Sequence, residues 1–209
     1  MNLNDNSTIK TYSILSLGDS YTIGESVTEE ERFPNQTIAL LMKDGINFSS
    51  PKIIATTGWT TDELQNAIDK ENISTTYDAV TLLIGVNNQY RSRSIDEYRE
   101  QFVELLNQAI TFAAKNKNHV FVLSIPDWGV TPYADGRDRT KIAQEIDAFN
   151  TVNKEESLKA GVHYIDITPI SRNAATDLSL VANDGLHPSG KMYAQWAAQL
   201  SPVIKTACK

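Results

Sequence analysis

Ser20 is the residue whose surroundings first suggest chemistry, because it closes a Gly18-Asp19-Ser20 tripeptide that follows an apolar run. A serine hydroxyl attacks a carbonyl effectively only when a nearby base takes its proton. His187 could supply that base. Asp184, three residues earlier in a turn-rich stretch, could aim a carboxylate at one ring nitrogen and leave the other for the serine. These residues predict nucleophilic catalysis, although residues 18–20 alone would equally suit a strand-ending turn or a phosphate cradle.

Alternating strands and helices must position these residues. Five short runs are rich in β-formers and continuously apolar, which is typical of strands covered on both faces: residues 12–17, 52–55, 79–84, 120–125 and 162–167. Helical patterns fall between and after them, at residues 34–43, 95–115, 141–160 and 190–206, and capping boxes at 60–63 and 94–97 mark two helix starts. This order predicts an α/β fold, a three-layer sandwich with a five-stranded parallel sheet, in one domain over residues 1–209.

The carboxyl ends of parallel strands share one edge of the sheet, and ligands bind beyond that edge. Ser20 follows the first predicted strand, Gly58 the second and Asn87 the third. His187 lies between the last strand and the last helix. We therefore expect these side chains to converge at the carboxyl edge.

The other two histidines and one further acid are alternatives for the site. His119 and His163 begin the fourth and fifth predicted strands, so we expect them at the opposite edge as partly exposed strand-end residues. Asp166, near the end of the fifth strand, could replace Asp184 as the partner of His187. We favour Asp184 because its tether to His187 is shorter.

Taken together, the motifs resemble the four sequence blocks of the SGNH hydrolases, also called GDSL esterases and lipases. The blocks are Gly18-Asp19-Ser20, a glycine after strand two, Gly-x-Asn after strand three and Asp-x-x-His near the C-terminus. The resemblance spans about residues 17–188. It implies a flavodoxin-like α/β/α sandwich that hydrolyses esters or thioesters through a Ser–His–Asp triad without a metal or cofactor.

The resemblance also implies a role for each matching residue. Ser20 would be the nucleophile, His187 the general base and then acid, and Asp184 the carboxylate that orients it. The oxyanion hole would consist of the backbone N–H groups of Ser20 and Gly58 and the side-chain amide of Asn87. An amide suits this role because it donates hydrogen bonds without carrying charge.

Two positions depart from the pattern of the family. Asn88 stands where a second acid is common, so the local hydrogen bond of that acid is in question. Tyr21 stands where leucine commonly follows the serine, which would alter the packing beneath it.

The polar segment 127–139 is a candidate pocket wall, since long loops of this kind often form lids. We expect Trp128 from this segment and Trp59 from the second strand's loop to shape the substrate pocket. Two arginines of the segment, Arg137 and Arg139, could bind an anionic substrate. A simple cover over the sheet edge is the alternative role for the segment.

Composition excludes several classes of protein. The chain has 209 residues, 41% hydrophobic and 22% charged, with a net charge of −7 and no basic cluster, which argues against nucleic acid as a partner. No apolar run could span a membrane, and the single Cys208 excludes an intramolecular disulfide. Residues 1–10 lack the apolar core of a signal peptide, so we expect either a cytoplasmic protein or one whose leader was removed.

The sequence thus predicts a serine hydrolase that cleaves esters of small soluble substrates through an acyl-enzyme on Ser20. An acyltransferase, a thioesterase or a lysophospholipase would use the same residues, and the choice among them stays open, as do the natural substrate and the oligomeric state. Two rival functions leave Asp184 and His187 without a role. They are a flavodoxin-like domain that binds FMN and an inactive carbohydrate-binding or scaffold module.

Overall fold

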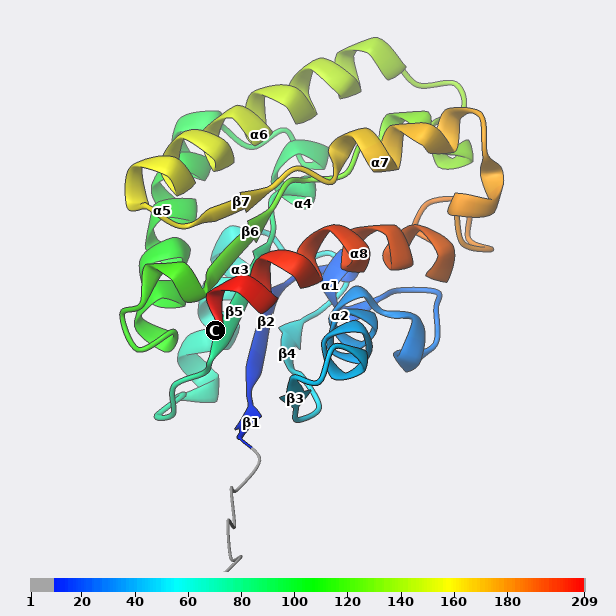
Figure 1. Cartoon of the computed structure of the whole chain (residues 1–209). Coiled ribbons are helices and arrows are strands. Elements are labelled where there is room, and N and C mark those ends of the chain that lie inside the picture. The colour runs from blue at the N-terminus through cyan, green and yellow to red at the C-terminus, as the bar shows by residue number, and fades with distance from the viewer. Residues whose placement is uncertain (1–9, 209) are drawn as a thin grey trace, which may run out of the picture.

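The computed structural model describes residues 10–208 and is built around a five-stranded parallel sheet with the order β4-β2-β5-β6-β7 (Figure 1). The strands are β2 (Ile14–Gly18), β4 (Lys52–Ala55), β5 (Ala79–Leu83), β6 (Val120–Leu123) and β7 (His163–Ile165). A second, short parallel pair, β1 (Thr11–Tyr12) and β3 (Asn47–Phe48), precedes β2 and β4. The predicted α/β fold with a five-stranded parallel sheet is confirmed.

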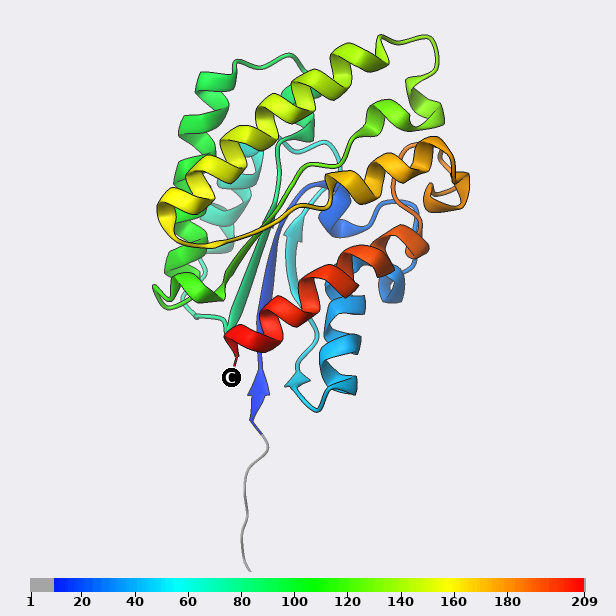
Figure 2. The same cartoon turned by 45° about the horizontal axis from the view of Figure 1, so that its top comes forward.

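Helices cover both faces of the sheet, which makes three layers (Figure 2). The long helices are α2 (Phe33–Lys43), α3 (Thr61–Glu71), α5 (Ile95–Phe112), α6 (Arg139–Ala160) and α8 (Gly190–Ala207). The helices α2 and α8 pack against each other on one face, whereas α3, α5 and α6 form the layer on the other face. None of the helices in residues 10–208 combines the length and the apolar character that a membrane span requires.

Burial on both faces explains the continuous apolar strands. Every residue of β2, β5 and β6 is buried, and α5 turns Tyr98, Phe102, Leu105 and Ala109 toward the core at helical spacing. The Thr60–Glu63 capping box is present at the start of α3. At the start of α5 the box is only half formed, because Glu97 turns to Arg93 instead of reaching back to the backbone of Ser94.

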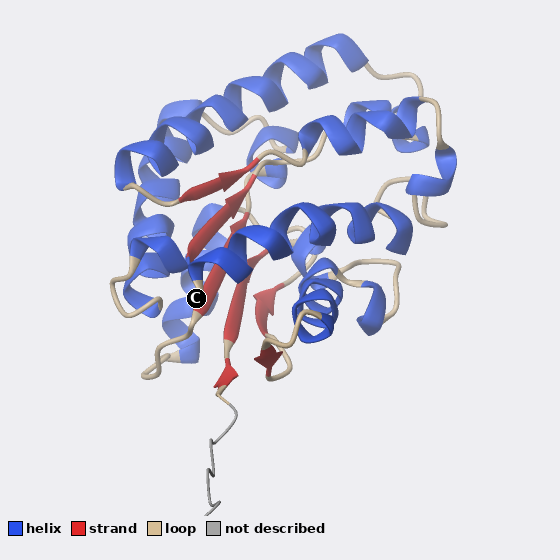
Figure 3. Cartoon of the chain, viewed as in Figure 1, coloured by secondary structure: helices blue, strands red, loops and turns tan. Residues whose placement is uncertain are grey.

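Short elements mark where the structure differs from the predicted ranges. The run 12–17 is divided at Ser13, whose N–H donates to Asp78 Oδ2 at 2.8 Å and so leaves the strand ladder. The short helices α1 (Ser20–Ile23), α4 (Val86–Tyr90) and α7 (Thr168–Arg172) were not predicted. Segment 127–139 is ordered by two 3₁₀ turns, η3 (Trp128–Val130) and η4 (Pro132–Ala134) (Figure 3).

Further 3₁₀ turns complete the chain outside the sheet. They are η1 (Glu29–Glu31), η2 (Lys117–His119), η5 (Asn173–Ala175) and η6 (Leu178–Leu180). The last two lead from α7 into the 181–188 segment, where Val181 forms an isolated antiparallel bridge with Pro188. That bridge closes the loop that carries Asp184 and His187.

Candidate active site

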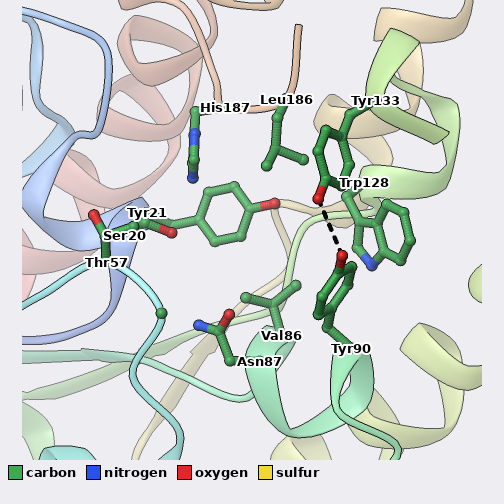
Figure 4. Close-up of a pocket in the computed structure, with 11 residues that line it drawn as sticks. Ser20, Tyr21, Thr57, Val86, Asn87, Tyr90, Trp128, Tyr133, Leu186 and His187 are labelled. Carbon is green, nitrogen blue, oxygen red and sulfur yellow. Dashed lines mark hydrogen bonds between the residues drawn. The ribbon is translucent and has the colours of Figure 1, made fainter. Parts of the chain in front are cut away.

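A pocket of about 150 Å³ opens at the carboxyl edge of the sheet (Figure 4). It is lined by residues from five separate segments: Ser20, Tyr21, Thr57, Gly58, Val86, Asn87, Tyr90, Trp128, Tyr133, Leu186 and His187. Ser20, Asn87 and His187 lie on one side of the view and Tyr90, Trp128 and Tyr133 on the other. The structure therefore brings the predicted residues Ser20, Gly58, Asn87, His187 and Trp128 to one cavity.

Ser20 is the first residue of α1, directly beyond the end of β2. The turn is tight, because a Cβ at Gly18 would overlap the carbonyl oxygen of Leu83. Asp19 caps α1 by accepting a hydrogen bond from the Tyr21 N–H at 3.0 Å, as expected of a turn residue. Burial raises the pKa of Asp19 to about 7, against the lowering effect of that hydrogen bond. A buried carboxyl thus immediately precedes the serine in the chain.

His187 is held by Asp184 within one turn. Its Nδ1 lies 2.6 Å from Asp184 Oδ2, while Asp184 Oδ1 accepts the N–H groups of Leu186 and His187, each at 2.9 Å. Gly185 takes φ +72°, a left-handed conformation that lets the chain reverse between the two side chains. Ser26 donates a further hydrogen bond to Asp184 Oδ2 at 2.7 Å. The carboxylate therefore fixes the ring and leaves its other nitrogen available to the pocket.

The hydrogen bonds of Asp184 also determine its charge. Partial burial acts to raise its pKa, but the bonds from His187, from the two backbone N–H groups and from Ser26 together lower that pKa to about 2. Asp184 is therefore a carboxylate at any pH near neutrality. This is the state that a residue orienting an imidazolium needs.

The structure does not bring the alternative residues to the pocket. Asp166 accepts a hydrogen bond from Ser124 Oγ at 3.1 Å and lines a different, polar groove beside α6 and α7. His119 Nε2 contacts the carbonyl oxygen of Ala207, and His163 stacks on Phe121 in β6. Trp59 packs against the core outside the pocket lining, contrary to the expectation that its side chain shapes the pocket.

Gly58 follows β4 and Asn87 lies in α4 after β5, and both line the pocket. Thr56 to Trp59 form a four-residue turn closed by Trp59 N–H to Thr56 O at 3.3 Å, and Gly58 in its third position has φ +88°. That conformation favours glycine. Lack of space is not the reason for a glycine here, since the nearest atom to an added Cβ would be 3.7 Å away. Asn87 Nδ2 donates one hydrogen bond to Trp59 O at 2.9 Å. Its second hydrogen is free to serve the pocket.

Both backbone donors of the predicted oxyanion hole are available. Among residues 10–208, neither the Ser20 N–H nor the Gly58 N–H donates to another protein atom. Asn88, the departure from the family pattern, is fully buried and joins α4 to the start of α3: it accepts from Thr61 N at 3.1 Å and donates to Thr61 Oγ1 at 2.7 Å. The Asn88 amide, which stands where the family commonly has an acid, therefore makes two hydrogen bonds of its own.

The opposite side of the pocket is aromatic. The rings of Tyr90, Trp128 and Tyr133 pack together with centroids 5.4 to 6.5 Å apart, and the two tyrosine hydroxyls are 3.0 Å apart. The Arg137 guanidinium lies 5.2 to 5.3 Å from the centroid of each ring. Hydrogen bonds with Tyr133 and Arg137 lower the pKa of Tyr90. Arg139, by contrast, pairs with Asp135 at 2.6 Å and donates to the carbonyl oxygen of Gly129 at 2.9 Å.

Several residues of the pocket and of its surroundings had no signal in the sequence. Ser26 reaches Asp184 across 158 residues, and Tyr90 and Leu186 belong to short segments without a periodic pattern. Tyr21, noted only as a departure from the family pattern, packs its ring edge-on against His187 with centroids 5.6 Å apart. In the described part of the chain, no three His, Cys, Asp or Glu side chains are grouped so as to hold a metal ion.

Solved structures with the same fold cover nearly the whole chain. A lipase/acylhydrolase from Enterococcus faecalis is 20% identical, with a TM-score of 0.71 over 93% of this chain and 96% of that one. The lipase Lip_vut3 from a goat rumen metagenome is 16% identical, with a TM-score of 0.75 over 92% and 97%. The esterase EstA from Pseudoalteromonas sp. is 16% identical, with a TM-score of 0.70 over 93% and 97%. At these identities the likeness establishes the fold.

Sequence comparison establishes the family. No curated protein is significantly similar to the chain. A family model described as the GDSL-like lipase/acylhydrolase family, however, matches residues 16–195. The resemblance inferred from the four sequence blocks is thereby confirmed. Because the match spans most of the sequence, the protein belongs to the GDSL-like lipase/acylhydrolase family and is a carboxylic ester hydrolase.

Proposed function

We propose that the protein hydrolyses esters of small soluble substrates through an acyl-enzyme on Ser20, with His187 as the base and Asp184 as the residue that orients it. One observation carries the proposal. Ser20 and His187 line the same pocket, and His187 is held at 2.6 Å by a carboxylate that is ionised near neutral pH. This arrangement supports transfer of the serine proton to the imidazole during attack.

The proposed reaction has two halves. Ser20 Oγ attacks the ester carbonyl as its proton passes to His187, and the N–H groups of Ser20 and Gly58 and the Asn87 amide stabilise the oxyanion. The bond to the alcohol breaks, and His187 gives its proton to the departing alkoxide. Water then attacks the acyl-enzyme as His187 accepts its proton, the bond to Ser20 Oγ breaks, His187 returns the proton to that oxygen, and the acid leaves. Each fixed donor in such a hole contributes about 2.7–4 kcal/mol to the transition state.

The size and lining of the pocket support a small substrate. A pocket volume of about 150 Å³ suits a short acyl chain or a small alcohol group. Val86, Leu186 and the three packed aromatic rings provide an apolar surface for that group. The proposed oxyanion donors Ser20, Gly58 and Asn87 line the same pocket.

Hydrolysis of p-nitrophenyl acetate and p-nitrophenyl butyrate tests the proposal. Ser20→Ala and His187→Ala should each lower kcat by about 10³-fold or more. Ser50→Ala, in an exposed loop, and His119→Ala, whose ring contacts Ala207, are matched controls that should retain wild-type rates. The proposal fails if Ser20→Ala and His187→Ala hydrolyse these esters as fast as the controls.

A further inference from the structure

The turn that carries Gly58 is fastened to α4 by its carbonyl groups. The carbonyl oxygen of Gly58 accepts a hydrogen bond from Arg91 Nη2 at 2.6 Å, and that of Trp59 accepts one from Asn87 Nδ2 at 2.9 Å. Asn87 and Arg91 are four residues apart, one helical turn, at the start and the C-cap of α4. Two consecutive carbonyls of the turn are therefore held by the same short helix.

Arg91 is itself fixed from its other side. Its Nη1 lies 3.2 and 3.3 Å from the two carboxylate oxygens of Glu63. Glu63 in turn accepts the Thr60 N–H at 2.9 Å as part of the capping box of α3. The planar guanidinium thus bridges a carboxylate anchored to a helix start and the peptide carbonyl of Gly58. A lysine ammonium has no such fork and could not span both partners with the same geometry.

The conformation of Gly58 makes this contact relevant to chemistry. Gly58 has φ +88°, and a glycine adopts positive and negative φ about equally readily, so nothing in its own side chain holds the turn in this form. The direction of the Gly58 N–H depends on that φ. A misplacement of about 1 Å at a reacting centre can lower a rate by roughly 10²-fold.

We infer that Arg91 is a positioning residue of the oxyanion hole, which holds the Gly58 carbonyl and thereby, through the backbone torsions of Gly58, directs its N–H toward the reacting carbonyl. The inference rests on the proposed function, since it depends on the Gly58 N–H being an oxyanion donor. Arg91 is not among the residues that line the pocket. Its effect should therefore appear in the stabilisation of the oxyanion and not in the binding of the ground-state ester.

Arg93 offers a matched control. It lies two residues further along the chain. It pairs with Asp62, in the first turn of α3, at 3.5 Å and with Glu97, in the first turn of α5, at 3.0 Å. It makes no hydrogen bond to the turn at Thr56–Trp59 among the described residues. Arg93→Gln removes a similar charge and similar ion pairs, so it reports the purely structural cost of losing an arginine here.

The test compares Arg91→Gln, Arg91→Lys and Arg93→Gln in two measurements. The first is kcat and KM for p-nitrophenyl acetate. The second is the inhibition constant of a short alkyl trifluoromethyl ketone beside that of its secondary alcohol. Ser20 Oγ adds to the ketone carbon and leaves an oxyanion in the hole, whereas the alcohol fills the pocket without one. The melting temperature of each variant shows whether it is folded.

We expect Arg91→Gln to lower kcat and ketone affinity by the same factor, about 10- to 100-fold, with KM and alcohol affinity within about twofold of wild type. Arg91→Lys should recover part of this loss, and Arg93→Gln should match wild type. The inference is overturned if Arg91→Gln behaves like Arg93→Gln, or if ketone and alcohol affinity fall together. If Arg91→Gln does not fold, the same criteria apply to Arg91→Lys. Ser20→Ala separates the two possible failures. If Ser20→Ala loses ketone affinity but Arg91→Gln does not, only this inference fails. If Ser20→Ala keeps wild-type ketone affinity, the proposed function fails.

Discussion

The two sides of the pocket are built by different physical means. On the polar side, Ser20 and His187 are 5% and 8% exposed, and hydrogen bonds to backbone groups fix the residues around them. On the aromatic side, Tyr90 and Tyr133 are 43% and 42% exposed and are held by ring packing, one bond between hydroxyls and the Arg137 guanidinium. This difference indicates that the polar side supports reaction geometry, whereas the aromatic side has room to select substrates.

Asp184→Asn tests the polar side with the largest expected effect. An amide can hold the His187 ring in the wrong tautomer and cannot stabilise the imidazolium, so kcat should fall by about 10⁴-fold. Ser26→Ala removes one of the hydrogen bonds on the same carboxylate and should cost less than about tenfold. Steady-state kinetics on p-nitrophenyl acetate measures both. Equal, small losses for the two variants would contradict the proposed role of Asp184.

Asp19→Asn tests the buried carboxyl that caps α1 next to Ser20. The folded-state pKa of Asp19, about 7, lies above its ordinary value of 3.8, so between these values the folded protein binds more protons than the unfolded chain. Stability should therefore fall as pH rises from about 4 to 7, by up to roughly 4 kcal/mol. Asp19→Asn should remove this loss because an amide does not ionise, and the amide oxygen can still accept the Tyr21 N–H. Urea unfolding at pH 4, 6 and 8 measures it; parallel pH dependence in the variant and wild type would refute the assignment to Asp19.

Asn87→Ala tests the amide of the proposed oxyanion hole. Removal of one donor should lower kcat by about 10²–10³-fold and change KM little, because the donor acts on charge that develops only in the transition state. Asn72→Ala, at the exposed end of α3, is a control outside the site. A rise in KM with unchanged kcat would instead place Asn87 in ground-state binding.

Tyr133→Ala tests the aromatic side and should have the smallest effect. Loss of the ring should change the ratio of kcat/KM for p-nitrophenyl butyrate to that for p-nitrophenyl acetate by about tenfold, with acetate turnover within about threefold of wild type. Tyr133→Phe keeps the ring but loses the hydroxyl bond to Tyr90, so it should stay close to wild type. A large loss of p-nitrophenyl acetate turnover in Tyr133→Ala would contradict the distinction between the two sides of the pocket.

Sequence patterns predicted the polar side better than the aromatic one, for physical reasons. The carboxyl ends of parallel strands share an edge, so Ser20, Gly58 and Asn87 could be placed there from strand order alone. The helices α1 and α4, of four and five residues, are too short for a periodic signal. The Ser26–Asp184 bond joins residues 158 apart, and Trp59 packs against the core although its position in the chain suggested the pocket. Such contacts depend on packing that one-dimensional spacing does not encode.

Covalent trapping of the nucleophile tests the central claim most directly. An organophosphate ester with a p-nitrophenyl leaving group should phosphorylate an activated serine, and peptide mass spectrometry locates the adduct. We predict one adduct per chain, on Ser20, with no adduct in Ser20→Ala and much slower labelling in His187→Ala. Labelling of another residue in the wild type, or equal labelling of Ser20→Ala, would contradict the assignment of Ser20 as the nucleophile.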